Sequence, residues 1–363
     1  MNKIPVYKPC FFGNEKKYVN ECLDSTWISS KGSFVNDFEN KFASYIEVNK
    51  ATTVSNGTVA LHLALKVLGI GYGDEVIVPT FTYIASVNAI AMTGAKPIFV
   101  DSIKDSWNLD FTQIEKMISS RTKAVMVVHL YGLPCSMDEI VKICKEKNLF
   151  LIEDAAEAFG SVYKGNKVGT FGDIATFSFF GNKTITTGEG GMVVSNNIKL
   201  IERAAYLKSQ SVSKSREYWH DELGYNYRMT NISAAIGLAQ LEKADTIIRK
   251  KRQLAIWYMS ELKNFPIFFQ KESPSVINSY WMVSVLMTDK EIRNKVRNSL
   301  NKYYIETRPL FFPAHTMPQF RINKTFPVAE FISERGMNLP SYPELKYEEI
   351  KYICSIIKSV LKG

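Results

Sequence analysis

Short apolar runs recur along the first half of the chain and predict a series of buried strands. They lie at 75–79, 97–101, 124–129, 150–153, 174–179 and 191–195. Most of these runs are continuously apolar rather than alternating, which is typical of strands covered by helices on both faces. Helical patterns stand between several of them, at 83–93, 110–119 and 136–147. Strand–helix alternation of this kind predicts an α/β fold with a doubly wound, mainly parallel sheet.

The pattern changes in the last third of the chain. An apolar helix is predicted at 231–241, and a long charged helix follows at about 242–263. Beyond it we predict one strand, at 280–287, and two helices, at 289–303 and 346–361. We therefore place a domain boundary near residue 245. A large α/β domain (1–245) would precede a smaller C-terminal α+β domain (246–363).

Composition narrows the class of protein. The chain has 363 residues, of which 46% are hydrophobic and 22% charged, as in ordinary globular proteins. No apolar run is long enough to cross a bilayer, and the first residues lack the apolar region of a signal peptide. We expect a cytoplasmic protein without a membrane partner.

The scarce metal-binding residue types do not cluster. The five cysteines are scattered without a C-x-x-C pair, and the four histidines also lie apart, so we expect neither disulfides nor a metal site. The net charge of +9 comes from dispersed lysines rather than from a basic arm. We therefore expect no nucleic-acid partner, whereas a phosphate-bearing small molecule would suit the positive field.

A Ser-Asn-Gly-Thr turn at 55–58 connects a short strand to an apolar helix. The free N–H groups at a helix start, together with the helix dipole, favour a bound phosphate. Gly57 would let a ligand approach the backbone, and Thr58 adds a hydroxyl. The same turn is equally common as a simple helix cap.

Two predicted strand ends carry further candidate chemistry. Tyr83 follows the strand at 75–79, where its ring could stack on a planar cofactor or pack in the core. Asp154 directly follows the strand at 150–153, where a carboxylate needs a partner because its burial is costly. Such an acid could hold the protonated ring nitrogen of pyridoxal phosphate, or it could serve as a helix cap or salt-bridge partner.

Lys183 follows the strand at 174–179 and precedes a glycine-rich turn. Burial disfavours the charge of a lysine, lowers its pKa and frees the amine as a nucleophile. Such an amine forms Schiff bases with aldehydes, including that of pyridoxal phosphate. From this stretch alone, Lys183 could equally be an ordinary lysine on the protein surface.

Together these motifs resemble the DegT/DnrJ/EryC1/StrS family of sugar aminotransferases, a branch of the aspartate aminotransferase fold (fold type I). The resemblance covers essentially the whole chain. The matching pieces stand in the family's order: Ser-Asn-Gly-Thr at 55–58, Pro-Thr-Phe-Thr-Tyr at 79–83, Glu-Asp-Ala-Ala-Glu-Ala at 153–158, Phe-Ser-Phe-Phe-Gly-Asn-Lys at 177–183, Thr-Gly-Glu-Gly-Gly at 187–191 and Gly-Tyr-Asn-Tyr-Arg-Met at 224–229.

The resemblance implies a pyridoxal 5′-phosphate enzyme that works as a homodimer with shared active sites. Lys183 would bind the cofactor's aldehyde and Asp154 its ring nitrogen, both as catalytic residues. The other residues implied to contact the cofactor are Gly57, Thr58 and Ser178 at the phosphate, Tyr83 on the ring, Glu157 near the ring oxygen, and Asn226 from the neighbouring subunit.

A closer likeness to one branch of the family lies in the stretches 22–32, 179–187 and 306–318. It implies that the substrates are a GDP-linked 4-keto-6-deoxy sugar and L-glutamate, and that the product feeds a surface polysaccharide such as O-antigen. Trp27, Arg308 and His315 are the implied sugar-nucleotide contacts. A structural ion pair is an equally good interpretation of Arg308.

Three other activities remain open from the sequence. The enzyme could aminate another nucleotide-linked 4-keto-6-deoxy sugar. It could instead be a sugar 3-dehydratase, although those relatives carry histidine where this chain has Lys183. A non-catalytic regulator that binds DNA or nucleotide-sugars is the third, but no helix-turn-helix with a clustered basic face is evident.

Overall fold

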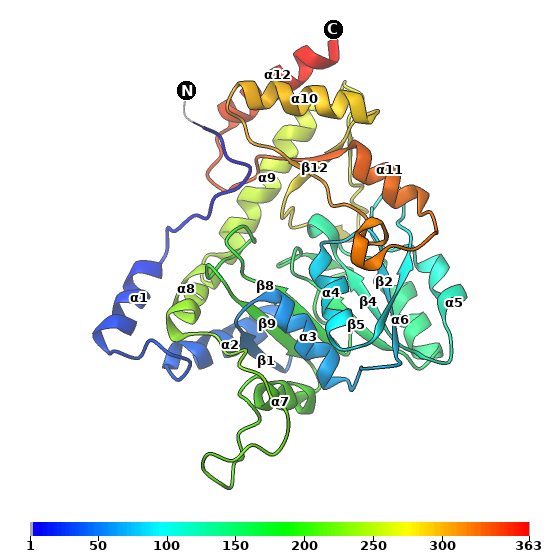
Figure 1. Ribbon diagram of the computed structural model, residues 1–363. Helices are drawn as coiled ribbons and strands as arrows, with labels where there is room; N and C mark the ends of the chain where they lie inside the picture. The colour runs from blue at the N-terminus through cyan, green and yellow to red at the C-terminus, as the bar shows by residue number, and fades with distance from the viewer. Residues whose placement is uncertain (1–2, 363) are drawn as a thin grey trace.

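A seven-stranded sheet forms the centre of the larger part of the molecule (Figure 1). The computed structural model describes residues 3–362. Strand β9 runs antiparallel to its neighbours β1 and β8, and every other pairing in the sheet is parallel. The mainly parallel sheet predicted from the apolar runs is therefore confirmed. In spatial order the strands are β1 (Lys50–Val54), β9 (Gly191–Ser195), β8 (Ile174–Ser178), β5 (Phe150–Asp154), β4 (Thr122–Val128), β2 (Glu75–Pro79) and β3 (Lys96–Val100).

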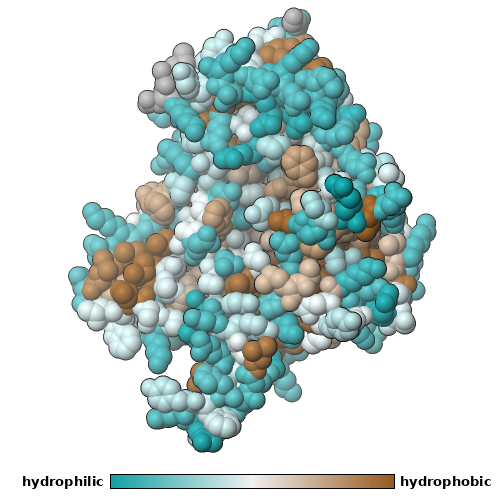
Figure 2. Space-filling model, in the orientation of Figure 1, coloured by the Kyte–Doolittle hydropathy of each residue, from teal (hydrophilic) through white to brown (hydrophobic). Residues whose placement is uncertain are grey.

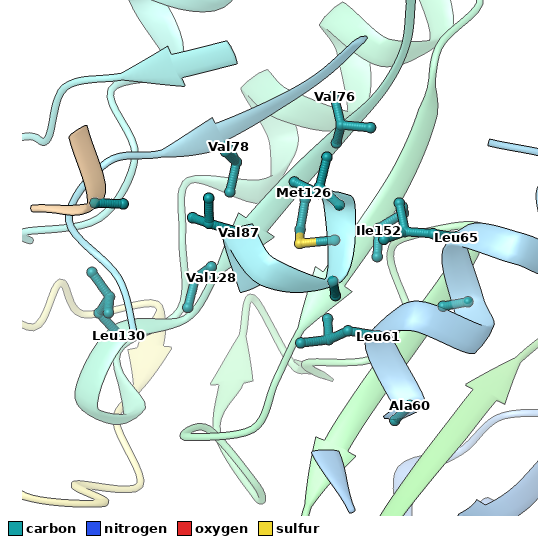
Figure 3. Close-up of a cluster of buried hydrophobic side chains, with 14 of the residues drawn as sticks. Ala60, Leu61, Leu65, Val76, Val78, Val87, Met126, Val128, Leu130 and Ile152 are labelled. Atoms are coloured by element: carbon teal, nitrogen blue, oxygen red, sulfur yellow. The ribbon is translucent and has the colours of Figure 1, made fainter. Parts of the chain in front are cut away.

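Helices cover both faces of this sheet, which explains why its strands are continuously apolar. In β2, Val76 and Val78 face one core cluster and Ile77 faces another. The first face carries α3 (Gly57–Val67), α4 (Ile84–Met92) and α7 (Ile198–Leu207), and Figure 3 shows the side chains that α3, α4 and the strands bury there. The opposite face carries α2 (Ser33–Ile46), α5 (Ile114–Met117), α6 (Met137–Glu146) and α8 (Asn231–Leu241).

A second, antiparallel sheet lies in the C-terminal part of the chain. Its strands, in spatial order, are β10 (Phe268–Phe269), β12 (Val283–Leu286), β14 (Gly336–Leu339) and β13 (Arg308–Pro309). The long helix α9 (Ala244–Leu262) runs from the first sheet toward this one, as Figure 1 shows. The helices around the second sheet are α10 (Lys290–Lys302), α11 (Pro327–Arg335) and α12 (Tyr347–Lys362).

Helix α9 connects the two cores and is itself part of both. Ile247 belongs to the core of the first sheet, whereas Leu254 and Tyr258 belong to that of the second. Ile4 also packs against the second core and pairs with Ile305 in an isolated bridge. A domain boundary near residue 245 would thus fall at the start of α9, and it stays a prediction.

The remaining elements are short. The predicted helix at 110–119 is reduced to a 3₁₀ turn at Phe111–Gln113 followed by α5, because the chain becomes extended at Ile118. Within residues 3–362, no helix is both long and apolar enough to traverse a bilayer. The other named elements are α1 (Glu15–Asp24), β6 (Val162–Tyr163), β7 (Asn166–Lys167) and β11 (Val276–Ile277), with 3₁₀ turns at Leu130–Gly132, Ala314–Thr316 and Pro318–Phe320.

Candidate active site

A cavity of about 540 Å³ lies beyond the ends of β5 and β8, where α3 and α4 begin. Ligands bind at this edge of open α/β sheets. The structure brings together here all the residues predicted to hold the cofactor, apart from Asn226. They are Gly57, Thr58, Tyr83, Asp154, Glu157, Ser178 and Lys183.

The first turn of α3 forms one end of the cavity. Asn56 caps this helix, its side-chain Oδ1 accepting the N–H of Val59 at 3.0 Å. A methyl group added at Gly57 would come within 2.7 Å of the Ser178 Cβ, so only glycine lets the helix start lie against the end of β8. The arrangement gathers helix N–H groups and the two hydroxyls of Thr58 and Ser178 around one position, which suits a phosphate.

Asp154 is a buried residue of the cavity lining. Its Oδ2 accepts a hydrogen bond from the Ser86 hydroxyl at 2.7 Å, and its Oδ1 accepts one from the Ala156 N–H at 3.1 Å. Burial raises the pKa of this carboxyl, while the two hydrogen bonds and the charge of Lys183 act in the other direction. A buried carboxylate in this position is suited to hold a cationic ring nitrogen.

Lys183 and Glu157 form a buried pair in the lining of the same cavity. The Lys183 Nζ lies 3.7 Å from Glu157 Oε1, and the backbone N–H of Tyr131 donates to Glu157 Oε2 at 2.9 Å. Burial raises the pKa of Glu157 to about 7 despite the attraction of Lys183. Burial also lowers the pKa of Lys183, against the attraction of both carboxylates, which favours a neutral, nucleophilic amine.

The Glu157 carboxyl makes the stability of the cofactor-free protein depend on pH. Its pKa of about 7 in the folded protein exceeds the ordinary glutamate value of 4.5, so between these pH values the folded state binds a proton that the unfolded state has lost. Stability contributed by this proton is present in acid and falls by up to about 3 kcal/mol as the pH rises through that window. Glu157→Gln is expected to flatten this decline. Urea unfolding across the window measures it, and an equally steep decline in the variant would contradict the assignment.

Tyr83 connects the cavity to a second, larger one. Its side chain is 55% exposed and stands before α4, with its ring centroid 5.6 Å from that of Phe311. The adjoining cavity of about 780 Å³ shares Tyr83 and Trp281 with the first. Arg308 lines it and pairs with Glu306 at 2.6 Å, so both earlier interpretations of Arg308, ion pair and ligand contact, fit its position.

Three residues predicted to contact substrate or cofactor lie outside both cavities. His315 is buried, and its ring hydrogen-bonds Thr80 at 2.7 Å and Glu330 at 3.2 Å instead of lining either cavity. Trp27 borders a separate hollow together with Asn231. Asn226 is exposed and pairs with Ser209 outside both cavities. Substrate contact by His315 and Trp27, and cofactor contact by Asn226, stay predictions.

Two residues that contact the side chains of the first cavity are absent from the sequence-based prediction. Ser86 lies one helical turn after Tyr83, so the helical spacing of α4 was the available signal for its contact with Asp154. Trp281 comes from the second sheet's side, and no local pattern indicated that it would reach Lys183.

Comparisons with known proteins identify the family of the chain. The model of the DegT/DnrJ/EryC1/StrS aminotransferase family matches residues 9–358. A GDP-perosamine synthase of Escherichia coli O157:H7 is 59% identical over 358 residues, which are 98% of each chain. The GDP-perosamine synthase of Vibrio cholerae is 51% identical, again over 98% of each chain.

Solved structures show the same fold. DesV of S. venezuelae superposes with a TM-score of 0.91 at 33% identity, covering 96% of this chain and 95% of that one. 3-Amino-5-hydroxybenzoic acid synthase superposes with a TM-score of 0.92 at 29% identity, covering 98% of each chain. A Streptococcus pneumoniae protein assigned as a sugar aminotransferase, solved in its PLP form, gives 0.95 at 28% identity over 99% of each chain.

Proposed function

Because the chain belongs to the DegT/DnrJ/EryC1/StrS aminotransferase family and is a fold type I aminotransferase, we propose that it binds pyridoxal 5′-phosphate in the cavity around Lys183. Three features of this cavity suit that group. The α3 start with Ser178 would receive the phosphate, Asp154 would hold the ring nitrogen, and the Lys183 amine would bind the aldehyde. When bound, the cofactor supplies an electron sink for the pair released as a C–H bond breaks.

The side chains of this cavity would carry out the proton transfers and stabilise the charges of the reaction. Asp154 keeps a proton on the ring nitrogen, since an ionised carboxylate next to it favours the cationic form. The freed Lys183 amine takes a proton from the α carbon of the amino donor, for which we propose L-glutamate. Glu157, 3.7 Å from this amine, favours its protonated form after the transfer. In the second half-reaction Lys183 returns a proton to the carbon that receives the amino group.

We propose GDP-4-keto-6-deoxy-D-mannose as the amino acceptor and GDP-perosamine as the product. One observation carries this choice: relatives named GDP-perosamine synthase align over 98% of the chain, at 59% and 51% identity. The adjoining cavity offers room beside the amine, and Arg308 at its border provides a cation for a diphosphate.

A homodimer with shared active sites is part of the proposal. Figure 2 shows a hydrophobic patch over the end of α1, where Leu23 and Ile28 are among the exposed apolar residues. Exposed apolar clusters on soluble proteins often mark interfaces. Trp27, next to Ile28 in sequence, is also exposed, and we propose that it contacts the second copy.

The substrate is tested by incubating the protein with glutamate and a panel of nucleotide-linked 4-ketosugars. We expect amination of the GDP-linked 4-keto-6-deoxymannose, identified by mass and NMR, with formation of 2-oxoglutarate. Turnover of UDP- or dTDP-linked sugars alone would refute the GDP assignment and leave the aminotransferase activity in place. Loss of the 3-hydroxyl in place of amination would identify a dehydratase.

A further inference from the structure

Trp281 approaches the catalytic lysine from the side of the second sheet. It stands two residues before β12, and only 5% of its surface is exposed. Its indole N–H donates to the backbone carbonyl of Asn182 at 2.7 Å. Its ring stacks on that of Tyr131 with centroids 6.0 Å apart and an interplanar angle of 4°. One stacking partner and a hydrogen bond at the polar edge therefore fix the indole in place.

The Lys183 amine lies over the ring of this tryptophan. Its Nζ is 3.9 Å from the centroid, about as close as it is to Glu157 Oε1 at 3.7 Å. The backbone on either side of the lysine side chain is also fixed, because the Tyr7 hydroxyl donates to the Lys183 carbonyl at 2.6 Å. The amine is thus held between a carboxylate and an aromatic face.

We propose that Trp281 is a positioning residue for the reaction, whose ring face holds the Lys183 amine whenever it is not bound to the cofactor. This inference rests on the proposed role of Lys183. An aromatic face attracts an ammonium through its quadrupole, and Trp does so more strongly than Phe or Tyr. The amine must accept and return a proton in each half-reaction, and the indole face gives the charged form a fixed partner.

This position also explains an otherwise unfavourable burial. An ammonium taken out of water costs free energy unless other groups compensate for its lost hydration. Glu157 offers one compensating charge, but its own pKa of about 7 leaves it partly protonated at neutral pH. The indole face is permanent, because no titration removes it. Trp281 therefore compensates the charge on Lys183 at any pH at which the amine is protonated.

The test measures the pKa of Lys183 directly. Trace labelling with acetic anhydride across a pH series, followed by digestion and mass spectrometry, reports the free amine in the full-length, cofactor-stripped protein. Trp281→Phe is expected to lower this pKa by about half a unit, because the weaker ring face stabilises the ammonium less. In the loaded enzyme, kcat is expected to fall roughly 3- to 10-fold at unchanged KM.

Tyr7→Phe is the matched control. It removes a hydrogen bond from the same turn but leaves the indole face in place. The proposal requires the Lys183 pKa to fall in Trp281→Phe and to stay unchanged in Tyr7→Phe. Equal shifts in both variants, or an unchanged or raised pKa in Trp281→Phe, would overturn it. Should Trp281→Phe fail to fold, Trp281→Tyr provides the same comparison.

The labelling result does not depend on turnover. If Lys183→Ala retained activity while Trp281→Phe shifted the pKa, the proposed function would fail and the contact would stand. If Lys183→Ala were inactive while Trp281→Phe left the Lys183 pKa unchanged, the proposed function would stand and the role of Trp281 would fail.

Discussion

Replacing Lys183 with alanine is expected to abolish transamination while leaving the chain folded. The amine is the nucleophile and the proton carrier of the cavity, and general acid–base catalysis alone contributes about 10²–10⁴-fold. We therefore expect kcat to fall by at least about 10³-fold. The fold should persist because Glu157, left without its partner, already has a pKa of about 7 and can take up a proton. Coupled assay of 2-oxoglutarate measures the activity, and circular dichroism and light scattering measure the fold and the assembly.

Lys183→Arg separates charge from chemistry at the same position. Arginine keeps a cation beside Glu157 and over the Trp281 ring, but its guanidinium stays protonated and cannot act as a base. This variant should be as inactive as the alanine variant. Sustained turnover by either protein would exclude Lys183 from the mechanism, whereas an unfolded alanine variant beside an inactive, folded arginine variant would still support it.

Much of the cofactor site was predictable because its residues follow strands closely in sequence. Asp154 is the last residue of β5, and Lys183 stands five residues after the end of β8. Gly57 opens the helix that follows β1. Parallel strands place their carboxyl ends at one edge, so apolar runs locate the strands and thereby the residues that follow them. Both the large sheet and the residues that line the cavity can therefore be located from local sequence patterns.

The features of the site that the sequence does not predict depend on contacts between segments far apart in the chain. Trp281 is 98 residues from Lys183 in sequence, and only the packing of the second sheet against the first brings them together. His315 shows the opposite case. The family resemblance implies a substrate contact for His315, which stays a prediction; in the structure both of its ring nitrogens have partners within the chain, Thr80 and Glu330. Neither outcome follows from periodicity, because tertiary packing decides which polar groups are already paired.

The substitution Asp154→Asn is expected to have opposite effects on activity and on stability. Asparagine fits the same space and can keep the hydrogen bonds to Ser86 and Ala156, but it carries no negative charge for a cationic ring nitrogen. Losing one such preorganised electrostatic partner costs about 10²–10³-fold in kcat. The cofactor-free variant, by contrast, should resist urea better than the wild type at neutral pH, since burial raises the pKa of Asp154.

The sign of the stability change follows from proton binding. With its folded pKa raised, Asp154 binds more protons in the folded state than in the unfolded state at pH values between the two pKa values. Wild-type stability therefore falls as the pH rises through that window, and the variant's advantage should vanish in acid. Asp173→Asn is the control, because Asp173 is an exposed carboxylate at the other end of the same strands, where its Oδ2 accepts the Leu151 N–H at 2.8 Å. Normal activity in Asp154→Asn, or lost activity in both variants, would contradict the role assigned to Asp154.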